Sequence, residues 1–199
     1  EFKNPIAIIS GYTETILNDE QMPQPMKIRF LKKIYSNANK MSHIVDKLRL
    51  TLKLEEGKQE LILIPCSMKK LIITCISDLK DKYKNREILI QGDDITLKVD
   101  ETLISMAISN LIENALKYSE DEIIVNISDN SITIIDKGIG IEEKELEKIN
   151  QKFYRISNNG WNNSLGLGLF IVQSVLSLHN FTLKIDSVFK NGSQFSINY

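Results

Sequence analysis

The sequence predicts an α+β protein that begins with an antiparallel helical hairpin and continues as a domain of mixed strands and helices. Two observations carry this prediction. Residues 1–56 repeat apolar side chains at helical spacing, whereas residues 57–199 alternate short β-rich runs with helical segments. We place the domain boundary at 56/57, because the Glu-Glu-Gly-Lys segment at that point interrupts the helical pattern.

The second helix of the hairpin is marked by a heptad pattern. Its apolar residues alternate three and four positions apart, at Leu31, Ile34, Ala38, Met41, Val45, Leu48 and Leu52. An earlier helix keeps helical spacing with Phe2, Ile6, Ile9 and Ile16. The polar segment 18–25 contains two prolines and separates the two helices.

A regular apolar seam requires a partner helix. Two helices with one seam each cannot enclose a core alone, so we expect residues 1–56 to form a homodimer as a four-helix bundle. The alternative is a hairpin that packs on its own C-terminal domain.

The remaining elements follow from short runs of β-formers and from helical periodicity. Strands are predicted at 87–91, 96–99, 122–128, 131–136, 182–188 and 193–199, and helices near 67–84, 101–118 and 167–179. The turn segments "SDNS" and "FKNGS", the second with Asn191-Gly192, predict two β-hairpins.

Composition excludes several classes of partner. Twenty-five basic and 26 acidic residues leave a net charge of −1, which gives no reason to expect nucleic acid or an acidic membrane surface. Cys66 and Cys75 have no neighbouring Cys or His cluster, so we expect free thiols in a reducing compartment. Apolar runs such as "LILI" are far shorter than the ~20 residues that cross a bilayer, so a membrane segment is expected only upstream of Glu1.

Three polar side chains share one face of the predicted helix 101–118. Asn110, Asn114 and Lys117 follow at spacings of four and three, away from the apolar face. Amide oxygens bind hard cations and an ammonium binds phosphate, so this face suits a phosphate chain with Mg²⁺. A merely solvated helix face remains the alternative.

Two glycine pairs mark further candidate positions. Asp136 ends a predicted strand and precedes "KGIGI", where an Asp can accept a hydrogen bond from an exocyclic amine. Gly166 and Gly168 precede a predicted helix, whose free N–H groups favour an anion. The segment does not match the dinucleotide-binding motif, because the third glycine of that motif is missing. The polar segment 142–164 between the pairs has the composition of a mobile lid, from which Arg155 would reach a phosphate.

Four of these segments, in this order, resemble the conserved boxes of sensor histidine kinases. "NLIENALKYS", "DKGIGI", "KFYR" and "LGLGLFIV" are similar to the N, first G, F and second G boxes, and the opening "EFKNP" resembles the H box without its leading His. The resemblance implies an α/β sandwich ATP-binding domain, the fold shared with Hsp90, type II topoisomerases and MutL. One departure is Ser164, which stands where the family commonly has glycine two positions before Gly166.

The resemblance also implies roles for individual residues, with ATP and Mg²⁺ as cofactors. Asn114 would be the Mg²⁺ ligand, Asn110 and Lys117 would contact phosphates, and Tyr118 would lie near the adenine. Asp136 would bind the adenine amine. The other implied nucleotide-binding positions are Gly138, Gly140 and Ile141 under the base, Phe153 and Arg155 in the lid, and Gly166, Leu167, Gly168 and Leu169 around the triphosphate.

The implied activity is autophosphorylation of a His expected immediately before Glu1, and transfer of the phosphoryl group to an Asp of a response regulator receiver domain. Glu1 would act as general base beside that His, and Asn4 would orient water for dephosphorylation of the regulator. Neither His43 nor His179 replaces the acceptor. The resemblance further implies the cytoplasmic portion of a bacterial inner-membrane sensor. The open alternatives are an ATPase clamp and a nucleotide-binding scaffold, both without phosphotransfer.

Overall fold

The computed structural model describes residues 2–57, 59–156 and 165–199, which fall into two compact units. The first unit holds the N-terminal part of the chain through Lys53, and the second begins at Leu54. The predicted boundary at 56/57 stays a prediction.

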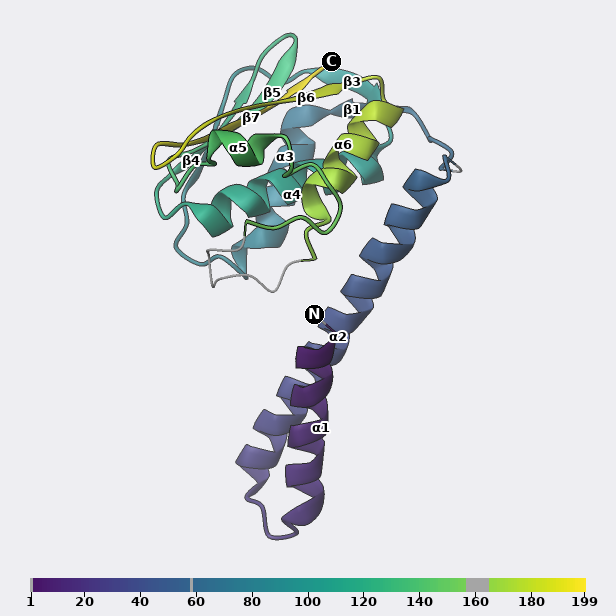
Figure 1. Ribbon diagram of the computed structural model, residues 1–199, viewed down its shortest axis with the longest axis vertical. Helices are drawn as coiled ribbons and strands as arrows, with labels where there is room; N and C mark the ends of the chain where they lie inside the picture. Colours follow the sequence, from purple (N-terminus) through teal and green to yellow (C-terminus); the bar gives the residue numbers. More distant parts are fainter. Residues whose placement is uncertain (1, 58, 157–164) are drawn as a thin grey trace. The chain divides into compact units, whose positions relative to one another are not determined.

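The first unit is a helical hairpin. Helix α1 (Lys3–Asn18) lies antiparallel to the N-terminal half of α2 (Gln24–Glu55), as Figure 1 shows. The two helices meet through aromatic side chains, because the ring centroids of Tyr12 and Phe30 lie 4.7 Å apart. Pro5 is buried in the first turn of α1, where proline costs no helical hydrogen bond. The predicted helical hairpin is confirmed.

In a single chain, the heptad residues of α2 fall into an exposed set and a half-buried set. Leu31, Val45 and Leu52 keep 50%, 52% and 59% of their surface exposed, whereas Ile34 and Met41 are half-buried. On α1, Ile9 and Ile16 are half-buried but Ile6 is 47% exposed, although it belongs to the predicted apolar face. One chain therefore leaves an apolar stripe of α2 in contact with solvent.

The second unit is an α/β sandwich, which confirms the predicted fold class. Its five-stranded sheet runs in the order β2 (Ile88–Gln91), β4 (Ile123–Ile127), β5 (Ser131–Asp136), β7 (Gly192–Asn198) and β6 (Thr182–Val188). Among the described strands, β2 and β4 are the pair that runs parallel. The β4–β5 and β6–β7 pairs are the two predicted hairpins. A separate two-stranded sheet joins β1 (Ile64–Ser67) to β3 (Thr96–Val99).

The helices α3 (Met68–Lys80), α4 (Glu101–Tyr118) and α6 (Gly168–Leu178) lie on one side of the large sheet, as Figure 1 shows. The apolar face predicted for α4 is confirmed, because Ile104, Ile108, Leu111 and Ala115 are buried. They share the core with sheet residues such as Ile134 and with α6 residues such as Ile171.

Three details differ from the sequence prediction. Strand β1 was not predicted. Its four residues form a strand by pairing with β3, for example Ile64 with Val99, and that partner lies more than 30 residues further along the chain. The third helix ends at Lys80 and not near residue 84, because the chain tightens there into a turn in which the Lys82 N–H donates to the Leu79 carbonyl three residues back (3.2 Å). The one-turn helix α5 (Glu143–Leu146) was also missed.

His179 ties the end of α6 to the start of α4. Its buried ring accepts the Asp100 N–H at Nε2 (3.0 Å), so Nδ1 carries the proton and donates to the Val175 carbonyl (2.8 Å). The Asp100 carboxylate in turn accepts the N–H groups of Leu103 and Ile62. His179 therefore has a structural role, whereas His43 is exposed.

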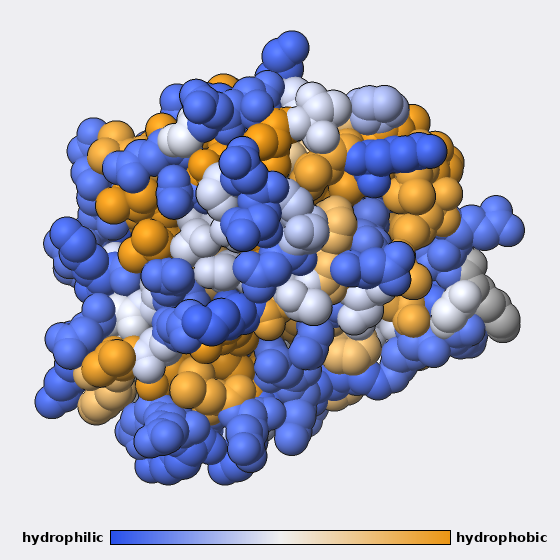
Figure 2. Space-filling view, turned by 90° about the horizontal axis from the view of Figure 1, so that it is seen from above, coloured by the Kyte–Doolittle hydropathy of each residue, from blue (hydrophilic) through white to orange (hydrophobic). Residues whose placement is uncertain are grey.

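Hydrophobic areas on the surface are divided by hydrophilic side chains (Figure 2). In the second unit, the exposed apolar residues include Ile62 before β1 and Val188 and Phe189 at the β6–β7 turn. Cys66 and Cys75 are free and buried, as predicted. Among the described residues, no helix combines the length and the apolar character needed to span a bilayer.

The uncovered stripe generates a prediction about assembly. Replacing Leu31 and Val45 with Asp should convert a dimeric chain to monomers, because burying two carboxylates per chain costs several kcal/mol each unless they protonate or the bundle opens. Sedimentation equilibrium would measure the change. The matched control places Asp at Ser36 and Ser42, which are exposed on the same helix. A variant that stays dimeric would contradict an interface through this stripe.

Candidate functional site

Asn110 lies where α4 packs on α6. Its side chain is buried, its Nδ2 donates to the Met106 carbonyl (2.8 Å), and a Cβ on Gly168 would lie 3.4 Å from its Oδ1. Gly168 is the first residue of α6, so the amide stands beside the start of that helix. The structure thus brings together two predicted site residues from distant parts of the sequence.

Asn114 and Lys117 continue the same face of α4 and are half-buried. Within the described part of the chain, the side-chain amide of Asn114 makes no hydrogen bond, and Lys117 pairs with Glu113 at 3.5 Å. No group of three or more His, Cys, Asp or Glu among the described residues is placed to hold a metal. Mg²⁺ commonly binds one or two protein oxygens together with phosphates and water, so a single amide oxygen fits that ion.

The loop after β5 packs against the last turn of α4. Ile139 N–H donates to the Tyr118 carbonyl (3.1 Å), and Gly138 N–H donates to Asp136 Oδ1 (2.8 Å). A Cβ on Gly138 would lie 2.1 Å from the Tyr118 oxygen and 2.8 Å from the Asp136 carboxylate. Only glycine fits at 138, and the close approach places Tyr118 beside Asp136.

The β6–β7 turn holds the other side of this loop. Ile139 accepts the Lys190 N–H (2.7 Å), and Ile141 N–H donates to Ser187 Oγ (2.8 Å). Gly140 has a φ of +62°, and a Cβ there would lie 2.1 Å from the Val188 carbonyl oxygen. The predicted positions 138, 140 and 141 therefore form one loop that is fixed on both sides.

Burial raises the pKa of the Asp136 carboxyl, and the N–H groups of Gly138 and Ser193 offset part of that rise. Since Asp136 as a residue is only 5% exposed, another donor that reached its carboxyl would be shielded from water. A buried acceptor at a strand end suits recognition of an exocyclic amine.

A backbone hydrogen bond joins Phe153, in the predicted lid segment, to Gly166, just before α6. Phe153 N–H donates to the Gly166 carbonyl (2.9 Å), and both residues have positive φ, at 62° and 68°. Leu167 is buried, and Gly168 and Leu169 open α6. Among the described residues, no side chain caps this helix start, whose N–H groups suit an anion.

The remaining predicted residues lie away from this site or outside the residues that the structure describes. Arg155 is exposed and has a polar or electrostatic contact, and Phe153 is 60% exposed. Asn4 is exposed on the first turn of α1. Glu1, the predicted general base, and Ser164 fall outside the described residues.

Sequence reasoning missed two residues that shape the site. Ser187 holds Ile141, and Gly192 lies so close to the end of β5 that a Cβ there would approach the Asp136 carbonyl oxygen to 2.1 Å. The Asn191-Gly192 pair signalled a hairpin turn, but nothing local signalled its contact with β5.

Comparison with known protein families identifies both units. Residues 99–199 match the family of histidine kinase-, DNA gyrase B- and HSP90-like ATPases, and residues 1–57 match the His Kinase A (phospho-acceptor) domain. The chain therefore belongs to this ATPase family. The two domains together are those of a histidine kinase core, and the ATPase match implies an ATP-binding domain.

Individual relatives agree with this family. The chain is similar over its whole length to the phosphate regulon sensor protein PhoR of Pseudomonas aeruginosa (31% identity) and to the sensor-like histidine kinase SenX3 of Mycolicibacterium smegmatis (27%). It covers 47% of the former and 54% of the latter, so it spans about half the length of these relatives.

Solved structures share the fold. The Acinetobacter baumannii histidine kinase AdeS aligns with a TM-score of 0.75 at 20% identity, over 98% of this chain and 94% of that one. Histidine kinase ThkA, solved in complex with the response regulator protein TrrA, aligns with a TM-score of 0.68 at 20% identity, over 99% of this chain and 57% of that one.

The glycine contacts generate a stability prediction. Gly138→Ala should lower the free energy of unfolding by about 1–3 kcal/mol, because its Cβ would overlap a backbone oxygen. Gly11→Ala is the matched control: apart from the backbone of its own helix and its chain neighbours, no described atom would lie within 4 Å of its Cβ, and a helical alanine should stabilise by about 0.5–1 kcal/mol. Denaturant unfolding would measure both. Equal effects at the two positions would contradict the tight fit at 138.

The raised pKa of Asp136 generates a pH prediction. A carboxyl whose pKa is raised by folding stabilises the fold below its ordinary pKa of 3.8, and that contribution is lost as the pH rises through the folded pKa. Asp136→Asn cannot ionise, so it should unfold at a higher temperature than the parent chain at neutral pH. The difference should shrink as the pH falls towards about 4. A difference in melting temperature that does not change with pH would contradict this assignment.

Proposed function

We propose that this chain is the ATP-dependent core of a protein histidine kinase, which phosphorylates a His immediately before Glu1 and passes the phosphoryl group to an Asp of a response regulator. One observation carries the proposal. A match to a phospho-acceptor hairpin and a loop built to hold Asp136 beside α4 occur in the same chain.

The residues of the second unit would bind the nucleotide by separate contacts. Asp136 would accept the adenine amine, Lys117 and the start of α6 would bind phosphates, and Asn114 would offer its amide oxygen to Mg²⁺. When bound, Mg²⁺ would neutralise part of the negative charge of the phosphates. Positioning of this kind accounts for most of the catalysis in phosphoryl transfer.

The residues of the first unit would act on the acceptor. Glu1 would orient the neighbouring imidazole and take its proton, and Asn4 would orient water when the regulator is dephosphorylated. The exposed stripe of Leu31, Val45 and Leu52 favours a homodimer through residues 1–56.

The solved relatives favour the same partners. The structural neighbour ShkA has been solved in complex with AMPPNP, an ATP analogue, and histidine kinase ThkA with a response regulator protein. We propose a receiver domain as the partner of this chain, with phosphatase activity towards it as a second activity. We also propose that the chain is the cytoplasmic portion of a larger bacterial inner-membrane sensor, since it spans about half the length of two relatives named as sensors.

An ATPase clamp without phosphotransfer is the rival function, since DNA gyrase B and HSP90 belong to the same ATPase family. The phospho-acceptor match at residues 1–57 favours the kinase.

The deciding experiment incubates the chain, with and without a His added before Glu1, with ATP labelled at the γ-phosphate. The extended chain should acquire acid-labile, base-stable phosphate, and the chain as printed should not. Label on the chain as printed would require another acceptor such as His43. ATP hydrolysis without label on either chain would favour the clamp.

Asn114→Asp should weaken Mg²⁺-dependent ATP binding, because a carboxylate beside the triphosphate repels it and alters the geometry of the metal site. Isothermal titration with and without Mg²⁺ would measure the change. Asn126→Asp, an exposed position on β4, is the matched control. An Asn114 variant with the parental Mg²⁺ dependence would remove this residue from the metal site.

A further inference from the structure

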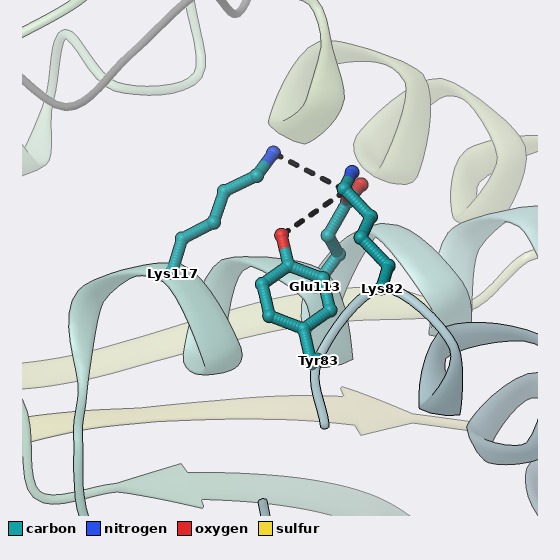
Figure 3. A network of polar contacts seen from close by, with 4 residues as sticks. All are labelled: Lys82, Tyr83, Glu113 and Lys117. Atoms are coloured by element: carbon teal, nitrogen blue, oxygen red, sulfur yellow. Dashed lines mark hydrogen bonds and ion pairs between the residues drawn. The ribbon is translucent and has the colours of Figure 1, made fainter. Parts of the chain in front are cut away.

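Glu113 stands at the edge of the candidate phosphate site without a role in the family pattern described above. It precedes Asn114 on α4 and lies one turn before Lys117, and its side chain is only 15% exposed. Its Oε1 pairs with the Lys117 ammonium (3.5 Å) and with the Lys82 ammonium, and it accepts the Tyr83 hydroxyl (3.4 Å). Figure 3 shows these side chains converging on one carboxylate.

The pair with Lys117 has the favourable helical geometry. A Glu four residues before a Lys on the same helix attracts it in the orientation that also suits the helix dipole. A lysine has a long flexible stem and loses considerable rotamer entropy when it is held in one place. Holding the Lys117 ammonium before a ligand arrives therefore removes part of that cost from binding.

The other partners make this arrangement compatible with an anion. A lone carboxylate beside a triphosphate would repel it. Here two ammonium groups surround one carboxylate, so Lys82, Glu113 and Lys117 together carry a net charge of +1. Tyr83 adds a neutral donor, and burial, followed by the charge of Glu113, raises the pKa of its hydroxyl, which keeps the proton in place.

The segment after α3 holds Tyr83 and Lys82 against α4. Arg86 donates to the carbonyl groups of Leu116 (3.1 Å), Ser119 (2.7 Å) and Asp121 (2.8 Å), which lie at and just beyond the end of α4. Lys82 also lies over the Tyr83 ring, 5.3 Å from its centroid. Residues 82–86 thus contact the last two turns of α4 at both the Glu113 carboxylate and the terminal carbonyl groups.

We propose that Glu113 is a positioning residue for nucleotide binding, which holds the Lys117 ammonium where a phosphate binds, and that Tyr83 and Arg86 fix Glu113 and the end of α4 from the segment 82–86. The proposal rests on the proposed function, because the phosphate contact of Lys117 belongs to it. Its ligand chemistry is the phosphate chain of an adenine nucleotide and not the base.

The test compares Glu113→Gln with the parent chain in titrations with Mg²⁺·ATP, Mg²⁺·ADP and adenosine. The variant keeps an acceptor for Tyr83 but loses the charge that holds Lys117. Affinity for ATP should fall about fivefold, while affinity for adenosine should stay unchanged. A general disturbance of the fold would lower the affinity for adenosine as well. Glu101→Gln, exposed in the first turn of the same helix, is the matched control.

A double-mutant cycle sharpens the result. If Glu113 acts through Lys117, then Glu113→Gln should add little loss of ATP affinity in a Lys117→Ala background. Independent losses would overturn the positioning role. If Glu113→Gln does not fold, Tyr83→Phe replaces it in the test, because it removes only one hydroxyl. This variant should lower the affinity for ATP by a smaller factor. Parental ATP affinity in Tyr83→Phe would overturn the proposal.

The outcomes separate the two levels of inference. A parent chain that binds neither ATP nor ADP would overturn the proposed function and this proposal together. A parent chain that binds ATP, with a Glu113→Gln variant that binds ATP equally well, would overturn the positioning role alone.

Discussion

The site depends on one close approach, between the last turn of α4 and the loop that follows β5. The Tyr118 carbonyl accepts the Ile139 N–H and leaves no room for a side chain at Gly138. The β6–β7 turn holds the same loop from its other side. The distance between Asp136 and the polar face of α4 is therefore set by backbone groups, which vary less than side-chain rotamers.

Helix α4 is held along its whole length, which explains how it can present polar groups at fixed positions. Asp100 caps its start and receives support from His179, and Asn110 stands against the first residue of α6. Arg86 satisfies carbonyl groups at its end. His179, Gly168 and Arg86 come from three different segments, so the orientation of the helix depends on the packing of the second unit as well as on the helix's own sequence.

Periodicity was sufficient to predict the hairpin, the long helices and the strands of the large sheet, because each has an apolar face that repeats along the chain. Gly138 and Gly140 were also recognisable, since glycines after a strand end indicate close backbone contact. The contacts of Arg86 and Tyr83 could not be predicted, because they join a short polar turn to α4 some 30 residues away. The two sets of the heptad seam likewise became distinguishable only when α1 was placed against α2.

The hydrogen bond between Phe153 and Gly166 has a consequence for natural variation in chain length. It joins the two ends of the intervening segment at a fixed point directly before α6. The entropic cost of closing a loop grows only with the logarithm of its length, by about 0.6 kcal/mol for each doubling. A change in the number of residues between Phe153 and Gly166 should therefore leave the start of α6 in place, because that start is fixed by the bond itself.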